Sequence, residues 1–194
     1  MKKLIEELLG LTEAVPKGFA KAAAPEVKPK TVPPAMREKI NRLEELLERL
    51  KKDRIELERR LMEELHLSDL PSNEADKLKG EIKEYLIKEQ IAVAECERAV
   101  AKLFAKEEEA TASELIQSLV GQLEESILNQ LKERAEELKK VSYIFRIGPR
   151  KESIEESVWS KVVDFVKGLV TRFRGWLDSF SGLVDKLNRA LETV

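Results

Sequence analysis

The sequence contains few of the residues from which catalytic and metal sites are built. It has one histidine and one cysteine among 194 residues. A single cysteine excludes an internal disulfide and is typical of a reducing compartment. No CxxC pair, HExxH helix, phosphate-binding loop or GxSxG elbow occurs in the chain. We therefore predict a protein that is not an enzyme and holds no cofactor and no metal, with His66 exposed near a helix end and Cys96 in the core.

Long apolar runs are also missing. No stretch approaches the roughly 18 apolar residues that a membrane-spanning helix needs. The N-terminus carries Lys2 and Lys3, but Glu6 and Glu7 interrupt the residues that follow, which disfavours a secretory signal. We expect a cytoplasmic protein, with peripheral attachment to a membrane or a place in a virus particle as alternatives.

Aromatic residues make up only 5% of the chain, whereas charged residues make up 37%, against roughly 25% in an average soluble domain. The 35 basic and 37 acidic residues nearly balance. This profile is typical of long helices and coiled coils, and also of thermophiles. No segment is strongly basic, since residues 1–35 hold six basic and four acidic side chains and residues 71–140 hold eleven and sixteen. A nucleic-acid partner is therefore disfavoured.

The chain begins with a short amphipathic stretch and a proline-rich segment. One face of the stretch, at helical spacing, consists of Leu4, Ile5, Leu8 and Leu9. A helix of this length is not stable alone in water, so we expect residues 1–11 to lie on the protein's own core, on a membrane surface or on a partner. Residues 12–35 hold five of the seven prolines and predict a semi-stiff linker.

Two heptad segments, 36–67 and 74–109, predict an antiparallel helical hairpin. Apolar residues recur in both at the alternating spacing of four and three that forms a coiled-coil seam. The seams consist of Met36, Ile40, Leu43, Leu47, Leu50, Leu57 and Leu61, and of Leu78, Ile82, Tyr85, Ala92, Cys96, Ala99 and Leu103. The segment SDLPSN at 68–73 ends the first helix and offers caps for the second. Because this turn is short, the helices should fold back on each other.

One charged residue interrupts each seam. These are Arg54 in the first segment and Glu89 in the second. Both lie at similar distances from the turn, so they should meet across the hairpin. We predict that Arg54 and Glu89 form an ion pair that sets the register of the two helices.

A third helix is predicted over 111–140, with a short extended segment after it. Thr111 and Glu114 fit a capping box. The apolar face consists of Ile116, Val120, Leu123, Ile127, Leu131 and Leu138. The alternation in the sequence VSYIFRIGP is typical of a strand that ends at a Gly-Pro pair. We therefore expect residues 141–152, and above all 142–148, to form an extended connector in an otherwise all-α protein.

The last segment, 153–194, is predicted to be a long amphipathic helix. Gly168, Gly175 and Gly182 recur every seven residues beside its wide apolar stripe. Glycine inside a helix costs up to about 1 kcal/mol, so this repeat indicates a surface approached closely by a neighbouring helix, a membrane or a partner groove. We expect membrane or partner contacts from Trp159, Val166, Phe173, Trp176, Phe180 and Leu187, together with the N-terminal Leu4, Ile5, Leu8 and Leu9.

The hairpin region resembles the helical hairpin of ESCRT-III proteins, above all the archaeal cell-division type. The resemblance rests on RLEELLERLKKDRIELERRLMEEL at 42–65 and EADKLKGEIKEYLIKEQIAVAECERAVAKL at 74–103. It implies a long hairpin followed by shorter helices, in a protein that polymerises into membrane-bound filaments. The chain departs from the family in its first helix, which is not basic, and in lacking a clear motif for recruiting an ATPase.

Three functions are compatible with these features. The first is a non-enzymatic, self-assembling helical scaffold that polymerises on a membrane surface or remodels it. The second is a structural subunit, capsid or nucleoprotein, of a virus or another large particle. The third is an adaptor that presents its C-terminal helix to a groove on a filament or polymerase. The expected partner is accordingly another copy of the chain, a membrane surface or a protein groove.

Overall fold

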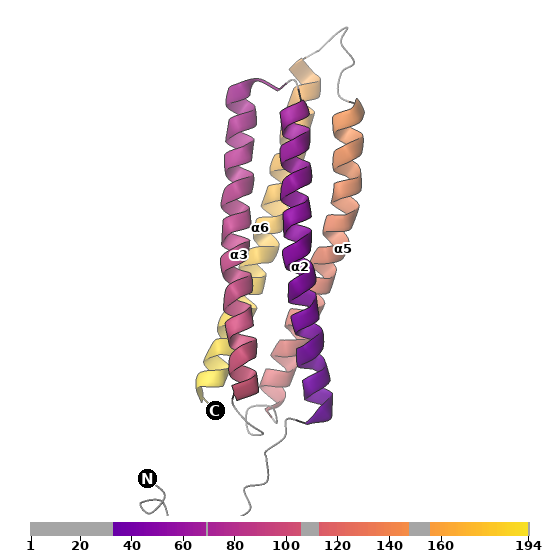
Figure 1. The fold of residues 1–194 in the computed structure, drawn as a ribbon. Coiled ribbons are helices and arrows are strands. Elements are labelled where there is room, and N and C mark those ends of the chain that lie inside the picture. Colours follow the sequence, from indigo (N-terminus) through magenta and orange to yellow (C-terminus); the bar gives the residue numbers. More distant parts are fainter. Residues whose placement is uncertain (1–32, 69, 106–112, 148–155, 194) are drawn as a thin grey trace, which may run out of the picture. The chain divides into compact units, whose positions relative to one another are not determined.

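The computed structural model describes residues 33–68, 70–105, 113–147 and 156–193, apart from the side chains of residues 142, 146, 147 and 156–159. Four long helices account for nearly all of these residues (Figure 1). They are α2 (Pro34–Leu67), α3 (Ser72–Ala105), α5 (Glu114–Ile147) and α6 (Glu156–Thr193). The chain divides into two units, Met1–Lys30 and Thr31–Val194, and all four helices belong to the second. The predicted N-terminal stretch and most of the linker lie outside the described residues.

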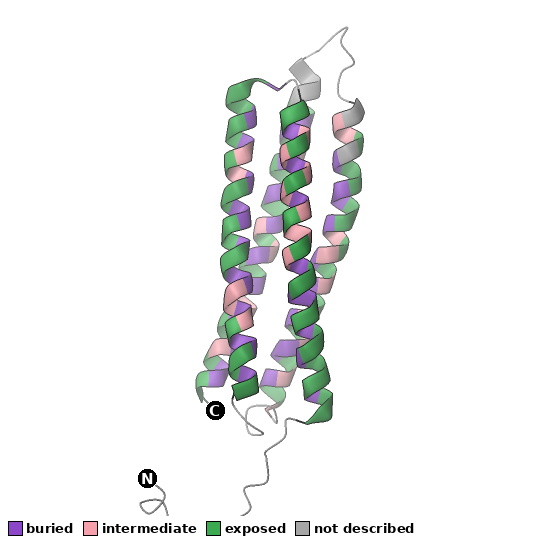
Figure 2. Cartoon of the chain, viewed as in Figure 1, coloured by how far each residue is buried: buried purple, intermediate pink, exposed green. Residues whose placement is uncertain are grey.

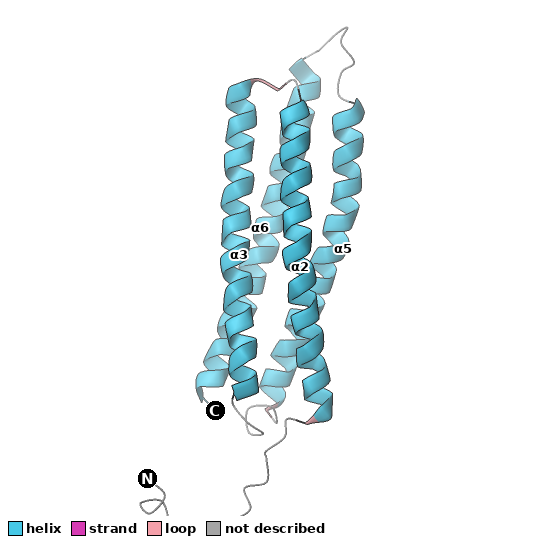
Figure 3. Ribbon diagram, viewed as in Figure 1, coloured by secondary structure: helices cyan, strands magenta, loops and turns pink. Residues whose placement is uncertain are grey.

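The predicted all-α fold is confirmed, since the described residues contain no strand (Figure 3). The extended connector expected over 141–152 is wrong as far as Ile147, because α5 continues to that residue. Val141 is buried, and Ile144 and Phe145 pack against the core. Val141, Ile144 and Phe145 follow the helical spacing of three to four residues, although the same segment also alternates as a strand does. A short apolar run can fit both spacings. Residues 148–152 lie outside the described part of the chain.

Helix α6, which lies within the C-terminal amphipathic helix predicted over 153–194, is the fourth helix of a bundle. Helix α2 contacts α3 and α5, and α6 contacts α3 and α5. The four helices therefore stand at the corners of a square in the order α2, α3, α6, α5. Helices that follow each other in the chain are neighbours within each hairpin, α2–α3 and α5–α6, whereas α3 and α5 stand at diagonal corners.

The two hairpins pack with like-directed helices side by side (Figure 1). Along α2 and α5 the residue numbers of contacting partners rise together, and the same holds for α3 and α6. The contacts are Arg42–Glu124 and Asp53–Arg134 in the first case, and Glu84–Arg174 and Lys102–Asn188 in the second. These neighbours are therefore parallel, while the helices within each hairpin are antiparallel.

The predicted seams form the core of the bundle. Every apolar residue assigned above to the seams of 36–67 and 74–109 is buried, including Cys96. Buried residues lie on the sides of the helices that face one another, and exposed residues lie on the outside (Figure 2). Full burial of one such aliphatic side chain contributes about 1.5–3 kcal/mol. His66 is exposed near the end of α2, as predicted.

A proline directly precedes each of two helices, Pro33 before α2 and Pro71 before α3. The carbonyl of Pro33 accepts hydrogen bonds from the amides of Met36 and Arg37, at 2.9 and 3.0 Å. The carbonyl of Pro71 accepts bonds from the amides of Glu74 and Ala75, each at 3.0 Å. A proline here removes an amide that would have no partner within the helix and fixes a helical φ. Both helices therefore begin two residues earlier than the apolar seam alone predicted.

Candidate functional site

A cluster of buried polar side chains interrupts the apolar core near its middle. Glu89 on α3 and Arg134 on α5 have no exposed surface at all, and Gln130 and Glu137 on α5 are also buried. Charged side chains are almost never fully buried unless they are paired. We call Arg134 with its direct partners Asp53, Tyr85 and Glu89 the Arg134 cluster.

Arg134 ties α5 to both helices of the first hairpin. Its Nη2 donates to Glu89 Oε2 and to the hydroxyl of Tyr85, each at 2.5 Å. Its Nη1 donates to Asp53 Oδ2 at 3.4 Å. The planar guanidinium presents several donors in a fixed geometry, so one arginine can hold three acceptors from two helices.

Aromatic rings from α3 and α6 enclose the guanidinium. Its carbon lies 5.3 Å from the ring centre of Phe173, 5.6 Å from that of Trp176 and 6.0 Å from that of Tyr85. A cation near an aromatic face is attracted by the negative charge of that face, and more strongly when water is excluded. Trp176 is fixed in turn, because its Nε1 donates to the hydroxyl of Ser126 at 3.0 Å. All four helices thus contribute to the surroundings of Arg134.

Burial and charge shift the pKa values in this cluster. Burial by itself would lower the pKa of Arg134, but the nearby Glu89, Tyr85 and Asp53 oxygens raise it above its usual value. Arg134 is therefore a permanent cation in the core. Burial raises the pKa of Tyr85 and of Asp53, and Arg134 opposes both shifts. The phenol therefore stays neutral and accepts the hydrogen bond from the arginine.

Several buried polar atoms in the Arg134 cluster and on the nearby Gln130 have no hydrogen-bond partner in the described part of the protein. They are Glu89 Oε1, Arg134 Nε and both polar atoms of the Gln130 amide. An unmet buried polar atom costs about 1–3 kcal/mol. Buried ion pairs are accordingly weak sources of stability, and their best-attested use is to fix register and pairing. The cluster is arranged to do this, because its members come from different helices.

A second ion cluster lies on the edge of the α5–α6 hairpin. Glu137 is buried and accepts a hydrogen bond from Lys140 at 2.9 Å, while its other oxygen lies 3.0 Å from Arg172 of α6. Burial would raise the pKa of Glu137, but Lys140 and Arg172 together lower it. Glu137 therefore stays ionised and joins α5 to α6.

The predicted pair of Arg54 and Glu89 does not form. Arg54 donates instead to the side-chain oxygen of Gln90 at 3.2 Å. The hairpin register was thus predicted to within one residue, but Glu89 points into the core and Arg54 lies at its edge. The reason is a competing partner, because Arg134 reaches Glu89 from α5 and neutralises it inside the bundle.

The contacts predicted for the C-terminal helix are also corrected. Val166, Phe173, Phe180 and Leu187 are fully buried within the bundle, so their stripe packs on α3 and α5 rather than on a membrane or a partner. Trp176 is partly buried against the same core. The side chain of Trp159 and the residues Leu4, Ile5, Leu8 and Leu9 lie outside the described part of the chain.

The three glycines of α6 face outward. An added Cβ at Gly168, Gly175 or Gly182 would meet no atom within 4 Å. The expectation of close approach by a neighbouring helix is therefore wrong within this bundle, and each position has room for a side chain.

Sequence reasoning missed Arg134, although a signal for it exists. Val120, Ile127, Arg134 and Val141 are spaced by seven, and the three apolar members are buried. Arg134 therefore interrupts a third seam, as Glu89 interrupts the second. Three polar residues at seam positions on different predicted helices would have suggested a shared polar layer.

The fold and the cluster define a four-helix bundle made of two hairpins that are joined by a buried ionic layer. Comparison of the chain with family models, curated proteins and solved structures found no match, so the resemblance to ESCRT-III proteins stays a prediction. Within the described ranges no helix is long and apolar enough to cross a bilayer. The same ranges contain no group of three or more acidic, histidine or cysteine side chains placed to hold a metal ion.

Proposed function

We propose that this protein is a non-enzymatic helical scaffold that self-associates through the outer face of its α2–α3 hairpin. The observation that supports the proposal is a set of large apolar side chains left on that face, although the seams of the bundle are covered. Ile55 on α2 is 61% exposed, and Ile87 and Ile91 on α3 are 58% and 54% exposed. We call these three side chains the isoleucine patch.

The isoleucine patch lies at one level of the hairpin. Because Arg54 donates to Gln90 and the two helices are antiparallel, Ile55 and Ile91 lie within one helical turn of the same height on neighbouring helices. Ile87 lies one helical turn from Ile91 on the same face of α3. Exposed apolar groups that gather on a rigid surface are typical of protein contact sites.

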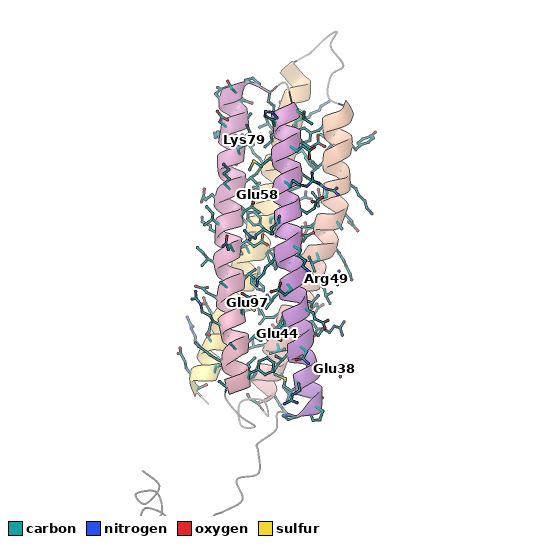
Figure 4. The ribbon with its side chains drawn as sticks, in the orientation of Figure 1. Glu38, Glu44, Arg49, Glu58, Lys79 and Glu97 are labelled. Carbon is teal, nitrogen blue, oxygen red and sulfur yellow. The ribbon has the colours of Figure 1, made fainter. Side chains whose placement is uncertain are left out.

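Charged side chains border this apolar surface. Glu84 and Lys88 form an ion pair within one turn of Ile87 on α3. Further along the hairpin, Glu44 of α2 and Glu97 of α3 line a groove between the two helices (Figure 4), and Lys51 pairs with Glu97 there. An apolar centre with a charged rim is the usual anatomy of a protein interface.

The proposal keeps the predicted self-assembly but changes the surface that carries it. The α6 stripe, which was expected to contact a membrane or a partner groove, is the core of the bundle. This removes the main support for an adaptor function and for membrane contact by that helix. Membrane attachment then depends on the amphipathic sequence of residues 1–11. A subunit of a larger particle would share the same self-association.

Sedimentation velocity over a wide concentration range tests the proposal. We expect the full chain to show concentration-dependent association, and Ile87→Ser/Ile91→Ser to shift it toward monomer. Leu115→Ser is the matched control, because Leu115 is 60% exposed on α5, away from the isoleucine patch. A wild-type chain that stays monomeric at every concentration would contradict the proposal. Electron microscopy with and without liposomes then distinguishes small oligomers, shells and membrane-bound filaments.

A further inference from the structure

The outer face of α3 carries a second heptad pattern in addition to its buried seam. Four small or apolar residues recur every seven residues along it, and a second row lies between them at the spacing of four and three. The rows are Gly80, Ile87, Ala94 and Ala101, and Glu84, Ile91 and Arg98. All of these residues are exposed except Ala94, which is half-buried. Interleaved rows of this kind form a helix-pairing surface, and the bundle leaves this one open.

The charges on this face are arranged with opposite signs about Ile91. Glu84 precedes Ile91 by seven residues and Arg98 follows it by seven. On the flank of the same face the sign alternates along the row Glu81, Lys88, Glu95 and Lys102. If a second copy of α3 is placed antiparallel to the first, by a two-fold rotation about an axis near Ile91, acidic positions of one copy come close to basic positions of the other.

We propose that two copies of the chain pair through α3, antiparallel, with a two-fold axis near Ile91. Glu84 of each copy then faces Arg98 of the other, and Lys88 faces Glu95. Ile91 packs near its own counterpart, and Ile87 packs near Ala94 of the second copy. Small residues at Gly80, Ala94 and Ala101 permit a close approach of the two helix axes. An isologous contact of this kind closes on itself with one pair of copies.

A parallel pairing of the same face does not have this complementarity. It would place Glu84 beside Glu84 and Arg98 beside Arg98, and like charges at a contact disfavour it. An anionic lipid surface fits less well, because it is attracted by an excess of Lys and Arg, whereas the flank row alternates in sign. The surface therefore favours a second copy of the chain.

Glu84, Lys88 and Arg98 of the proposed contact are exposed in the single chain, and Glu95 is half-buried. Glu84 accepts a hydrogen bond from Lys88 at 2.7 Å and lies 3.6 Å from Arg174, yet its side chain is 56% exposed. Exposed ion pairs of this kind are weak and exchange readily. Glu84 can therefore accept Arg98 of the second copy without unfolding any part of the bundle.

Charge-reversal variants of the full chain test this pairing, which rests on the proposed self-association. We expect Glu84→Arg and Arg98→Glu each to weaken dimerisation about tenfold, since each change places like charges at two symmetric positions. The double variant Glu84→Arg/Arg98→Glu should recover most of the wild-type affinity. Sedimentation equilibrium measures the affinity, and thermal unfolding checks that each variant folds. Arg98→Glu is the stricter single variant, because it leaves the contacts of Glu84 in place.

A cysteine cross-link locates the two-fold axis independently. In a chain with Cys96→Ala, we expect Ile91→Cys to form a disulfide-linked dimer, since only residues near a two-fold axis meet themselves. Ile55→Cys in the same background is the control and should remain unlinked. Association that is unaffected by either charge reversal, with no cross-link at position 91, would overturn this pairing and leave the proposed scaffold standing. A wild-type chain that never associates would overturn both, as would binding of this face to anionic vesicles alone.

Discussion

Arg134 of α5 and Glu89 of α3 are joined by a hydrogen bond of 2.5 Å, and both side chains have no exposed surface. These helices occupy diagonal corners of the bundle, so the bond crosses its centre. The two residues are 45 positions apart in the chain. Because each buried charge relies on the other to compensate its desolvation, the pair is sensitive to the loss of either member.

Removing the cation alone should destabilise the bundle strongly. We expect Arg134→Met to lower the free energy of unfolding by about 3–5 kcal/mol, because it leaves Glu89 as an unpaired buried carboxylate. Urea unfolding followed by circular dichroism measures this. Lys132→Met is the control, since Lys132 is exposed on the same helix, and it should change stability by less than about 0.5 kcal/mol.

Replacing both charges should cost much less than replacing one. We expect Glu89→Leu/Arg134→Leu to be at least as stable as the better of the two single variants, because no fully buried charge is then left unpaired and Asp53, which also loses Arg134, is partly exposed. A double-mutant cycle gives the coupling energy. Strictly additive effects of the two substitutions would show that Arg134 and Glu89 do not depend on each other.

The parallel arrangement of α2 and α5 can be measured by cross-linking. Arg42 and Glu124 form an ion pair at 2.7 Å, so cysteines at these two positions in a Cys96→Ala chain should be joined by a short bis-maleimide. Trp176 of α6 donates to Ser126 of α5, so Ser181 stands within about one helical turn of the level of Glu124, but α2 and α6 are diagonal in the bundle. We therefore expect Arg42→Cys with Ser181→Cys to remain unlinked, and a reversed preference would mean that the second hairpin is turned around.

Acid should weaken the bundle partly through Glu137. Its pKa is lowered in the folded protein, where Lys140 and Arg172 outweigh burial. The stabilisation is therefore present above the unfolded pKa of roughly 4.3 and is lost as the pH falls through the lower folded-state pKa. We expect Glu137→Gln to reduce stability at pH 7 and to flatten its decline below about pH 4. An unchanged pH dependence in this variant would mean that Glu137 does not contribute to it.

Cys96 should be chemically inert in the folded protein. Burial raises the pKa of its thiol to about 12, and the thiolate is the reactive form. We expect iodoacetamide at pH 8 to leave the native chain unmodified and to alkylate it in urea, with mass spectrometry as the measurement. A chain carrying Ala101→Cys should gain one rapidly modified thiol, because Ala101 is exposed on the same helix. Rapid native modification of Cys96 would indicate that the core opens.

The α2–α3 hairpin shows that helical periodicity predicts which residues are buried but not which charged residues pair. Every apolar residue that the spacing of four and three placed in the seams of α2 and α3 is buried, because burial of an amphipathic stripe is decided locally by the helical period. The same reasoning placed Arg54 beside the correct turn of α3. It could not choose Glu89 or Gln90 as the partner, because that choice depends on Arg134, which approaches from another part of the chain.

The segment around Val141 shows a second limit. Its alternating aromatic and aliphatic residues fit a strand, while Val141, Ile144 and Phe145 also fit a helix. A strand needs a neighbouring strand to satisfy its backbone groups, whereas the helical ridge of α5 continues onto the existing core. The packing of α5 therefore decided that the segment around Val141 is a helix, whereas the local pattern fitted both a helix and a strand.

By itself the sequence determined the four long helices, their apolar stripes and the antiparallel pairing of α2 with α3, because these follow from local periodicity and a short turn. The tertiary structure alone decided which hairpin faces which, and it covered the apolar stripe of α6. The reason is distance along the chain. Arg134 contacts partners that are 45, 49 and 81 residues away in the chain. Heptad stripes of similar width can pack against one another in several combinations, and the buried ion pairs of Arg134 select one of them.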